Sequence, residues 1–350
     1  MKEKNKYVLL RLKIILLILW RGKVSIKKLF NLGHSWLAHM TRLKKTSRLP
    51  FMMNFELWNE CNAQCTFCRT KDGDIYNLNP ETNPSLPITK GRMPLPLYQG
   101  IIDQVKDQLL IAVLYVNGEP LMYKDLGSAI RYASERKVAT MIATNGALLF
   151  KDKIVELLDS NLDLIKIAIT GFTQEIYTVQ HRNTNIEKIK ENLRNLARLK
   201  KKRRSGLIVM LDYILYDYNQ HEKERVSELC AELGFIFNIR PGNHFKLEEE
   251  RPDLIPDRLA PRPKLPIQEL CEWPWQVMTI NWNGDMLPCC DYVMWGGATP
   301  YATFEPGKTQ VEEVWNGSVS VNYRLIHLTE GRKGIDICSQ CPRTGTAFKY

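Results

Sequence analysis

The chain has 350 residues, 44% of them hydrophobic and 25% charged, which is the composition of a globular protein with one large domain or two and excludes a low-complexity chain. The formal net charge of +11 lies at the beginning: residues 1–48 hold thirteen Lys and Arg against the single acidic residue Glu3, a balance of +12 that leaves −1 for the rest. This distribution argues against a nucleic-acid surface on the body of the protein. An odd count of nine cysteines argues against a secreted disulfide framework and favours metal ligands in a reducing cytosol.

The basic N-terminal arm, residues 1–48, contains an apolar run. Its uninterrupted part, Ile14–Trp20, is too short to span a bilayer, which takes roughly 20 apolar residues, and no small-residue cleavage site of a secretory signal follows it. Two interpretations stay open: an amphipathic helix that covers the bottom of the folded body, or an interfacial helix that contacts the inner face of the membrane peripherally. In the second, the residues at the interface are Trp20, Arg21, Lys23, Lys27 and Lys28.

From residue 49 onward, short apolar segments rich in β-forming residues alternate with helical patterns. The predicted strands are Phe51–Leu57, Ile111–Val116, Ala139–Ala143, Leu164–Ile169, Leu207–Leu215 and Phe235–Ile239. The predicted helices between them cover residues 96–109, 123–136, 150–159, 173–180, 186–202 and 220–233. This alternation predicts a parallel sheet with right-handed crossovers, either an open doubly wound sheet or part of a barrel.

Polar segments follow nearly every predicted strand. In chain order they are Cys61 to Cys68, Asn117-Gly118-Glu119-Pro120, Thr144-Asn145-Gly146, Thr170-Gly171, Asn219 and Arg240-Pro241-Gly242-Asn243. Loops that follow the carboxyl ends of barrel strands converge on one face, so we expect these segments to surround one pocket.

The first segment has the spacing Cys61-x3-Cys65-x2-Cys68. Structural zinc normally takes four protein ligands, and no fourth Cys or His lies nearby, since the next histidine is His181. Three thiolates leave one position open, which favours an iron–sulfur cluster that binds a further molecule at its fourth iron, with zinc as the alternative.

This segment resembles the C-x3-C-x-φ-C motif of the radical S-adenosylmethionine (radical SAM) superfamily, with Phe67 at the aromatic position. The resemblance implies a partial (β/α)6 TIM-like barrel over residues 49–245 and a [4Fe-4S] cluster on Cys61, Cys65 and Cys68 that binds S-adenosylmethionine (SAM) at its fourth iron. It also implies an enzyme that reductively cleaves SAM to a 5′-deoxyadenosyl radical, which abstracts hydrogen from a substrate.

The loops after the next strands are similar to the same family. Gly118-Glu119-Pro120 resembles its GGEP motif, with Asn117 in place of the first glycine. The resemblance implies that Glu119 and nearby carbonyl groups receive the methionine ammonium group of SAM. An ordinary turn is the alternative interpretation.

Three further positions resemble SAM contacts of the family. Thr144 and Asn145 resemble the segment that lines the ribose, and Thr170 stands where many relatives carry a serine near the ribose or methionine part. Arg182 resembles the arginine that pairs with the methionine carboxylate. A capped turn and a surface arginine are the alternatives.

Residues 246–350 hold five more cysteines and a hairpin signal at Asn283-Gly284. Four thiolates from this hairpin and a terminal Cys-x2-Cys suit zinc or a [4Fe-4S] cluster, and their spacing does not separate the two. The run resembles the SPASM or Twitch domain of radical SAM enzymes, which implies an auxiliary [4Fe-4S] cluster on Cys271, Cys289, Cys338 and Cys341. The spare thiol, Cys290, is then structural, an alternative ligand or a catalytic hydrogen-atom donor.

The predicted fold class is therefore α/β: a partial (β/α)6 TIM-like barrel, a small C-terminal hairpin-containing iron–sulfur domain and an N-terminal amphipathic helical arm. We expect a cytoplasmic oxidoreductase or epimerase that takes electrons from flavodoxin or ferredoxin and dehydrogenates or epimerises a small-molecule or glycan-type substrate. The alternative enzyme is a maturase that introduces a thioether, a crosslink or an epimerised residue into a ribosomally made peptide. The alternative without enzymatic activity is a zinc-binding module. The candidate substrate contacts are Tyr115, Asp212, Tyr213, Arg240, Asn243 and Trp275.

Overall fold

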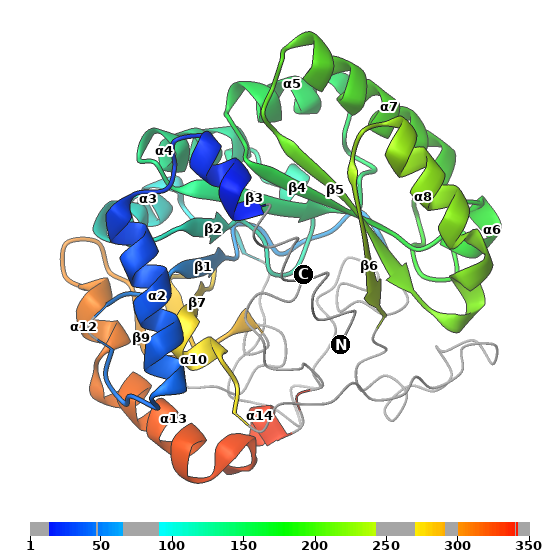
Figure 1. The fold of residues 1–350 in the computed structure, drawn as a ribbon. Coiled ribbons are helices and arrows are strands. Elements are labelled where there is room, and N and C mark those ends of the chain that lie inside the picture. Colours follow the sequence, from blue (N-terminus) through cyan, green and yellow to red (C-terminus); the bar gives the residue numbers. More distant parts are fainter. Residues whose placement is uncertain are drawn as a thin grey trace.

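The computed structural model describes residues 14–46, 48–65, 91–242, 270–290, 300–339 and 341. Within them one sheet has the strand order β6-β5-β4-β3-β2-β1-β7-β8-β9, so that β6 and β9 are its edges and the barrel is open (Figure 1). The first six strands run parallel, which confirms the predicted partial barrel. They are β1 (Met52–Phe55), β2 (Ile111–Val113), β3 (Ala139–Thr144), β4 (Leu164–Ile169), β5 (Ile208–Leu215) and β6 (Ile236–Pro241).

Helices cover the outer face of these strands and follow the predicted alternation (Figure 1). They are α3 (Leu95–Val105), α4 (Leu126–Glu135), α5 (Lys151–Asp159), α6 (Gln174–Tyr177), α7 (Ile186–Lys202) and α8 (Lys223–Glu232), with the 3₁₀ turns η2 (Pro120–Met122) and η3 (Asp217–Glu222). Ile165 and Ile167 of β4 pack in one core with Ile189 of α7, while Leu164 packs in a second core with Met210 of β5. Because strand side chains alternate between faces, Lys166 and Asp212 therefore point to the inside of the barrel.

The C-terminal hairpin joins this sheet instead of forming a layer of its own. After α10 (Trp273–Gln276), strand β7 (Val277–Ile280) pairs parallel with β1, and β8 (Asp285–Leu287) returns antiparallel to β7. Gly284 makes the turn with φ +95°, as the Asn-Gly signal predicted. The remaining elements are β9 (Ala302–Thr303), α12 (Val311–Trp315), α13 (Ser318–Thr329), η5 (Gly331–Gly334) and α14 (Asp336–Ser339).

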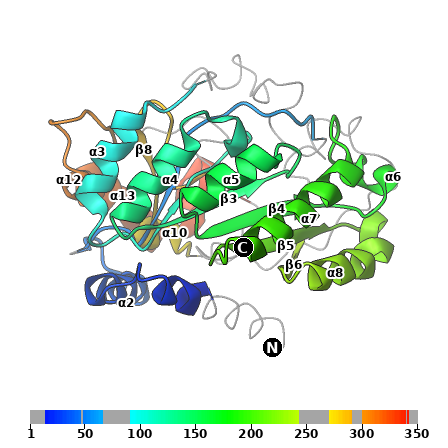
Figure 2. The ribbon, with the colours of Figure 1, turned by 90° about the horizontal axis from the view of Figure 1, so that it is seen from above.

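The N-terminal arm lies along the amino-terminal ends of the strands as a separate layer (Figure 2). Residues 14–20 are helical, and α2 (Ile26–Met40) follows. Ile14 and Ile18 are buried in the inner core with Leu164 and Ile208. The helices of the arm therefore pack against the bottom of the barrel.

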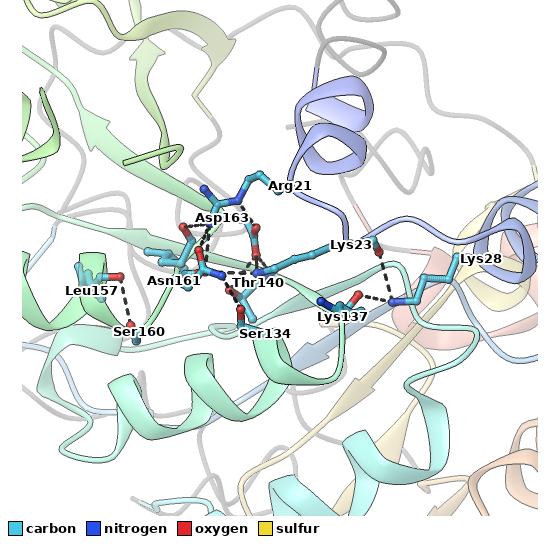
Figure 3. Close-up of polar contacts among 11 residues, drawn as sticks. Arg21, Lys23, Lys28, Ser134, Lys137, Thr140, Leu157, Ser160, Asn161 and Asp163 are labelled. Atoms are coloured by element: carbon cyan, nitrogen blue, oxygen red, sulfur yellow. Dashed lines mark hydrogen bonds and ion pairs between the residues drawn. The ribbon is translucent and has the colours of Figure 1, made fainter. Parts of the chain in front are cut away.

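A buried carboxylate, Asp163, fastens this arm to the barrel (Figure 3). Its two oxygens accept hydrogen bonds from Arg21 Nε at 2.6 Å and Lys23 Nζ at 2.6 Å, and the Thr140 N–H donates to it at 2.8 Å. Burial lowers the pKa of Lys23, and the adjacent Asp163 opposes that shift. The two ion pairs of Asp163, with Arg21 and with Lys23, thus join the loop before β4 to a segment about 140 residues earlier.

We expect Asp163→Ala to lower the free energy of unfolding by about 3–5 kcal/mol, because it leaves the Lys23 ammonium group buried without its counter-charge. Asp103→Ala is the matched control, since Asp103 pairs with Arg136 and Lys106 at the surface, and it should cost less than about 1 kcal/mol. Urea unfolding followed by circular dichroism measures both. Equal losses in the two variants would contradict the role given to Asp163.

Candidate active site

The predicted cluster loop leaves β1 at the carboxyl edge of the sheet. Cys61 and Cys65 are partly exposed, and the Ala63 N–H points at the Cys61 sulfur, at 3.4 Å. The Asn145 side-chain NH₂, from the loop after β3, lies 3.8 Å from the same sulfur. Phe67 and Cys68 lie outside the described residues. N–H groups directed at a sulfur are what a thiolate ligand requires.

Gly118 brings the loop after β2 into direct contact with the cysteine loop. Its φ is +65°, and a Cβ added to it would lie 2.6 Å from the Trp58 carbonyl oxygen and 2.7 Å from that of Glu60. The next residue, Glu119, donates its N–H to the Glu60 carbonyl at 2.8 Å. Glycine is therefore required here both for backbone conformation and for space.

Asn117, which departs from the family's glycine, has a structural role. Its N–H donates to both carboxylate oxygens of the fully buried Glu56, at 3.1 and 3.0 Å, and its side-chain NH₂ donates at 2.9 Å. The asparagine thus supplies a buried carboxylate just after β1 with a donor that glycine lacks.

The Glu119 carboxylate is buried and joins the loops after β2 and β3. It accepts hydrogen bonds from the Thr144 hydroxyl at 2.7 Å, the Leu121 N–H at 3.1 Å and the Asn145 N–H at 2.9 Å. Pro120 begins η2 and so positions the Leu121 N–H. Burial raises the pKa of Glu119 to about 7, and the three hydrogen bonds oppose that shift. A carboxylate has about four acceptor sites, so one remains for a further donor.

The Asn145 side chain completes the connection to the cysteine loop. Its NH₂ group donates to the Asn62 side-chain oxygen at 3.0 Å, and its own oxygen accepts from the Ala147 N–H at 2.9 Å. The structure therefore brings together the predicted SAM contacts Gly118, Glu119, Pro120, Thr144 and Asn145 around the cysteine loop.

Thr170, after β4, is fully buried and hydrogen-bonded to His181 Nδ1 at 2.7 Å. The imidazole stacks on Tyr177 with ring centres 4.7 Å apart. Burial, with the Arg240 charge adding to it, lowers the pKa of His181 to about 3, so the ring is neutral near pH 7. The sequence carries no signal that marks His181 as a site residue, because it lies in no recognisable motif.

Arg182 follows on the same loop and reaches the cysteine loop through its backbone. The Gln64 N–H donates to its carbonyl oxygen at 3.1 Å, and the Arg182 side chain is exposed. Arg182 is the predicted partner of the methionine carboxylate of SAM. Because it lies beside Gln64, it is at the rim of the site.

A charged cluster lies on the inner face of β4, β5 and β6. Asp212 is fully buried, accepts from the Asn238 NH₂ at 2.7 Å and from Arg240 Nε, and lies 3.7 Å from Lys166 Nζ. Burial alone would raise the pKa of Asp212, but Lys166 and Arg240 hold it below its ordinary value. The Arg240 side chain remains 37% exposed, and the Tyr115 hydroxyl lies within reach of its charge.

Three of the candidate substrate contacts therefore belong to the barrel interior: Tyr115, Asp212 and Arg240. The placement of two others was wrong. Tyr213 packs in the outer core and donates its hydroxyl to the Asn219 carbonyl at 2.6 Å, because strand alternation turns it away from the inner face. Trp275 donates to the Leu43 carbonyl at 2.7 Å, beside the arm. Asn243 lies outside the described residues.

The C-terminal cysteines gather near the end of β8. Cys289 and Cys338 both pack against Leu287, and Cys271 lies with them close enough to influence the Tyr301 hydroxyl. The other two cysteines are Cys290, next to Cys289, and Cys341, whose N–H donates to the Cys338 carbonyl at 3.3 Å. Within the described ranges, no three acidic, histidine or cysteine side chains converge closely enough to hold a single metal ion.

Two family models match this chain. The radical SAM superfamily matches residues 55–225, and an iron–sulfur cluster-binding domain, SPASM, matches residues 271–342. The chain is a radical SAM enzyme with a C-terminal SPASM domain. These two domains imply a SAM-binding [4Fe-4S] cluster and an auxiliary iron–sulfur cluster.

This radical SAM enzyme is similar to one curated protein in sequence and to two solved structures in fold. An S-adenosylmethionine-dependent nucleotide dehydratase of Flammeovirga pacifica is 30% identical over 146 residues, which cover 42% of this chain and 47% of the relative, so the match spans about half of that protein. Streptococcus suis SuiB bound to S-adenosylmethionine has a TM-score of 0.59 at 16% identity, over 89% of this chain and 75% of SuiB. BtrN in complex with AdoMet and 2-DOIA has a TM-score of 0.51 at 15% identity, over 85% of this chain and 95% of BtrN.

The residues of this radical SAM enzyme fit the implied group. Cys61 and Cys65 share one loop, N–H groups point at a sulfur, and the Glu119 carboxylate beside them keeps one acceptor site open. The donors suit thiolate ligands, and the open acceptor site suits an ammonium group.

We expect Gly118→Ala to lose about half of the cluster iron, because the added Cβ would push the loop after β2 away from the cysteine loop. Gly234→Ala is the matched control, since Gly234 has φ +66° but nothing within 4 Å of an added Cβ. That control should cost about 1–2 kcal/mol of stability, from the left-handed backbone alone, and keep its iron. Iron per chain after anaerobic reconstitution measures the difference, and equal iron in both variants would refute the close-contact argument.

The raised pKa of Glu119 predicts a pH-dependent stability in the absence of SAM. The carboxyl of the unfolded chain titrates near 4.5 and that of the folded protein near about 7, so the folded protein binds more protons in between. This group's contribution to the free energy of unfolding therefore falls as the pH rises through that window, by up to about 3 kcal/mol. Urea unfolding of the wild type and of Glu119→Gln across the window should give a stability difference that declines with pH. A constant difference would contradict the shift.

Proposed function

We propose that this radical SAM enzyme abstracts hydrogen from a small polar substrate that carries an anionic group, and that the outcome is dehydrogenation or epimerisation. The observation that carries this proposal is the charged cluster of Lys166, Asp212, Asn238 and Arg240 on the inner face of the barrel. The cofactors supply the one-electron cleavage of SAM and the abstraction of a substrate hydrogen. The protein supplies their ligands and the orientation of both molecules.

We assign the ligands from the placement of the thiols and the family pattern. The SAM-binding cluster is held by Cys61, Cys65 and Cys68, and the auxiliary cluster by Cys271, Cys289, Cys338 and Cys341. Cys290 adjoins the auxiliary ligands, and its candidate role is that of a hydrogen-atom donor. The SAM molecule is held by Phe67, Gly118, Glu119, Pro120, Thr144, Asn145, Thr170 and Arg182.

The charge balance of the inner cluster indicates the substrate class. Two cations, Lys166 and Arg240, face one carboxylate, Asp212, which leaves this cluster with an excess of one positive charge. Asp212 and Asn238 hold Arg240 in place, while its guanidinium group stays partly exposed. A fixed guanidinium group in a partly desolvated site suits a phosphate or carboxylate.

Two relatives support a small substrate. The nucleotide dehydratase acts on a molecule that carries phosphate, and BtrN, which this chain covers almost completely, was solved with 2-DOIA. Maturation of a peptide is the alternative, since SuiB has also been solved with precursor peptide SuiA at a TM-score of 0.57. We propose flavodoxin or ferredoxin as the electron donor in either case.

Substrate-stimulated cleavage of SAM tests the proposal. Reconstituted enzyme is reduced with SAM and offered nucleotides and sugar phosphates in one series and short peptides in another, and 5′-deoxyadenosine is measured. We expect stimulation by a phosphorylated small molecule, and Arg240→Ala should raise its KM about tenfold or more, because a charged hydrogen bond is worth about 1.5–3 kcal/mol. The slow cleavage without substrate should persist in this variant.

The matched control is Arg194→Ala, since Arg194 is an exposed arginine on α7, and it should leave KM unchanged. Cys65→Ala is the inactive reference and should retain about four of about eight irons, as expected for one of two [4Fe-4S] clusters. Stimulation by peptides alone, with no effect of Arg240→Ala, would overturn the small-substrate proposal in favour of peptide maturation.

A further inference from the structure

Helix α2 presents its polar side to the protein. Its buried residues are Lys28, Asn31, Ser35 and Ala38, at helical spacing along one face. Lys28 Nζ donates to the Lys137 carbonyl oxygen, and the Asn31 NH₂ donates to the Gln108 carbonyl oxygen at 2.8 Å. An ordinary surface helix buries its apolar side, so this orientation is the reverse of the usual one.

The outward side of the arm is correspondingly apolar. Ten of the twelve exposed large hydrophobic side chains in the described part of the protein lie between residues 16 and 43. Exposed aromatic side chains are prominent among them: Trp20 is 79% exposed, Phe30 66% and Trp36 59%. The others are Leu16, Leu19, Ile26, Leu29, Leu37, Met40 and Leu43. A concentration of exposed apolar side chains of this kind marks an interaction site.

The contacts of the arm hold this surface outward. Arg21 and Lys23 are bound to buried Asp163 (Figure 3). Ile14 and Ile18 are packed in the barrel core. To bury the apolar side of the arm, the Arg21 and Lys23 ion pairs would have to break, which would leave the Lys23 ammonium group without its partner at a cost of several kcal/mol. Rotation of α2 would also withdraw Lys28 and Asn31 from their carbonyl acceptors. The apolar surface is therefore a fixed feature of the fold.

The charge beside this surface indicates its partner. Lys27, Arg42, Lys44 and Lys45 are exposed, and none forms an ion pair with a carboxylate within the described ranges. The sequence has no acidic residue between Glu3 and residue 48 to offset them. Exposed aromatic and aliphatic side chains flanked by unpaired cations match the acyl chains and anionic headgroups at a lipid surface.

We propose that this arm, residues 14–45, docks the protein on the surface of an anionic lipid bilayer, with Trp20, Phe30 and Trp36 inserted among the lipids and the four cations on the headgroups. In the described part of the chain, no helix has the length and hydrophobicity needed to cross a membrane, so the arm lies in the plane of the interface.

Docking through the arm would turn the active site away from the bilayer. The arm contacts Gln108, Lys137 and Asp163, which precede β2, β3 and β4, whereas the site residues follow the carboxyl ends of the strands. The layer of helices that would touch the bilayer is thus on the opposite side of the barrel from the cysteine loop (Figure 2). Docking leaves the mouth of the barrel open to the aqueous side, whichever substrate it takes.

Flotation of the full chain with lipid vesicles tests this proposal. We expect binding to vesicles of phosphatidylglycerol and phosphatidylcholine that is about tenfold or more tighter than to phosphatidylcholine alone, and that weakens with salt. The double variant Phe30→Ser/Trp36→Ser should weaken binding about tenfold or more, because it removes inserted apolar area. The triple variant Lys27→Glu/Lys44→Glu/Lys45→Glu should weaken it about a hundredfold.

Matched controls separate docking from general stickiness. Phe150→Ser removes an aromatic side chain that is 58% exposed on the body, and Lys151→Glu/Lys188→Glu/Lys201→Glu reverses three exposed lysines there. Both should bind vesicles as the wild type does. Equal binding by the arm and control variants would overturn the proposal. So would a dimer in sedimentation velocity that Phe30→Ser/Trp36→Ser dissociates while vesicles bind nothing, since a second copy would then cover the surface.

Discussion

The Glu119 carboxylate accepts hydrogen bonds from Thr144, Asn145 and Leu121, and these bonds hold the loops after β2 and β3 against each other. Gly118 presses the first of these loops onto the backbone after β1, and Asn145 reaches the cysteine loop from the second. Three strand ends distant in sequence thereby share one buried network. The geometry around the SAM-binding cluster depends on it, because a buried carboxylate without its donors costs several kcal/mol.

The interior of the barrel is arranged in layers along its axis. Ile14 and Ile18 of the arm close the bottom against Leu164 and Ile208. Inward positions recur every second residue, so Lys166 lies two residues above Leu164 along β4, and Thr170 lies about 13 Å beyond Lys166 at the strand end. An apolar floor, a charged middle and a polar mouth thus succeed one another. Under the proposed function, a substrate held by the middle layer would extend toward the cysteine loop at the mouth.

The arm attaches to the barrel through its polar side and exposes its apolar side. Its polar side makes buried ion pairs and hydrogen bonds to the barrel, and its apolar side faces outward. Most amphipathic helices gain stability by burying apolar area, whereas here specific polar contacts replace that gain. The arrangement gives up hydrophobic stabilisation in water, and a lipid surface would restore it.

The sequence by itself determined the six-unit β/α alternation, the hairpin at Asn283-Gly284 and the segments that meet at the barrel mouth, because periodicity and turn chemistry are local properties. The cysteine spacings and the Gly118-Glu119-Pro120 segment likewise identified the superfamily. Only the tertiary structure decided that the hairpin extends the barrel sheet beside β1, that His181 supports Thr170, and that Tyr213 faces outward. It alone turned the polar side of α2 inward, because the acceptors of Lys28 and Asn31, the Lys137 and Gln108 carbonyl groups, are 109 and 77 residues away in sequence. Strand pairing and long-range ion pairs leave no local pattern, so the fold must be known to see them.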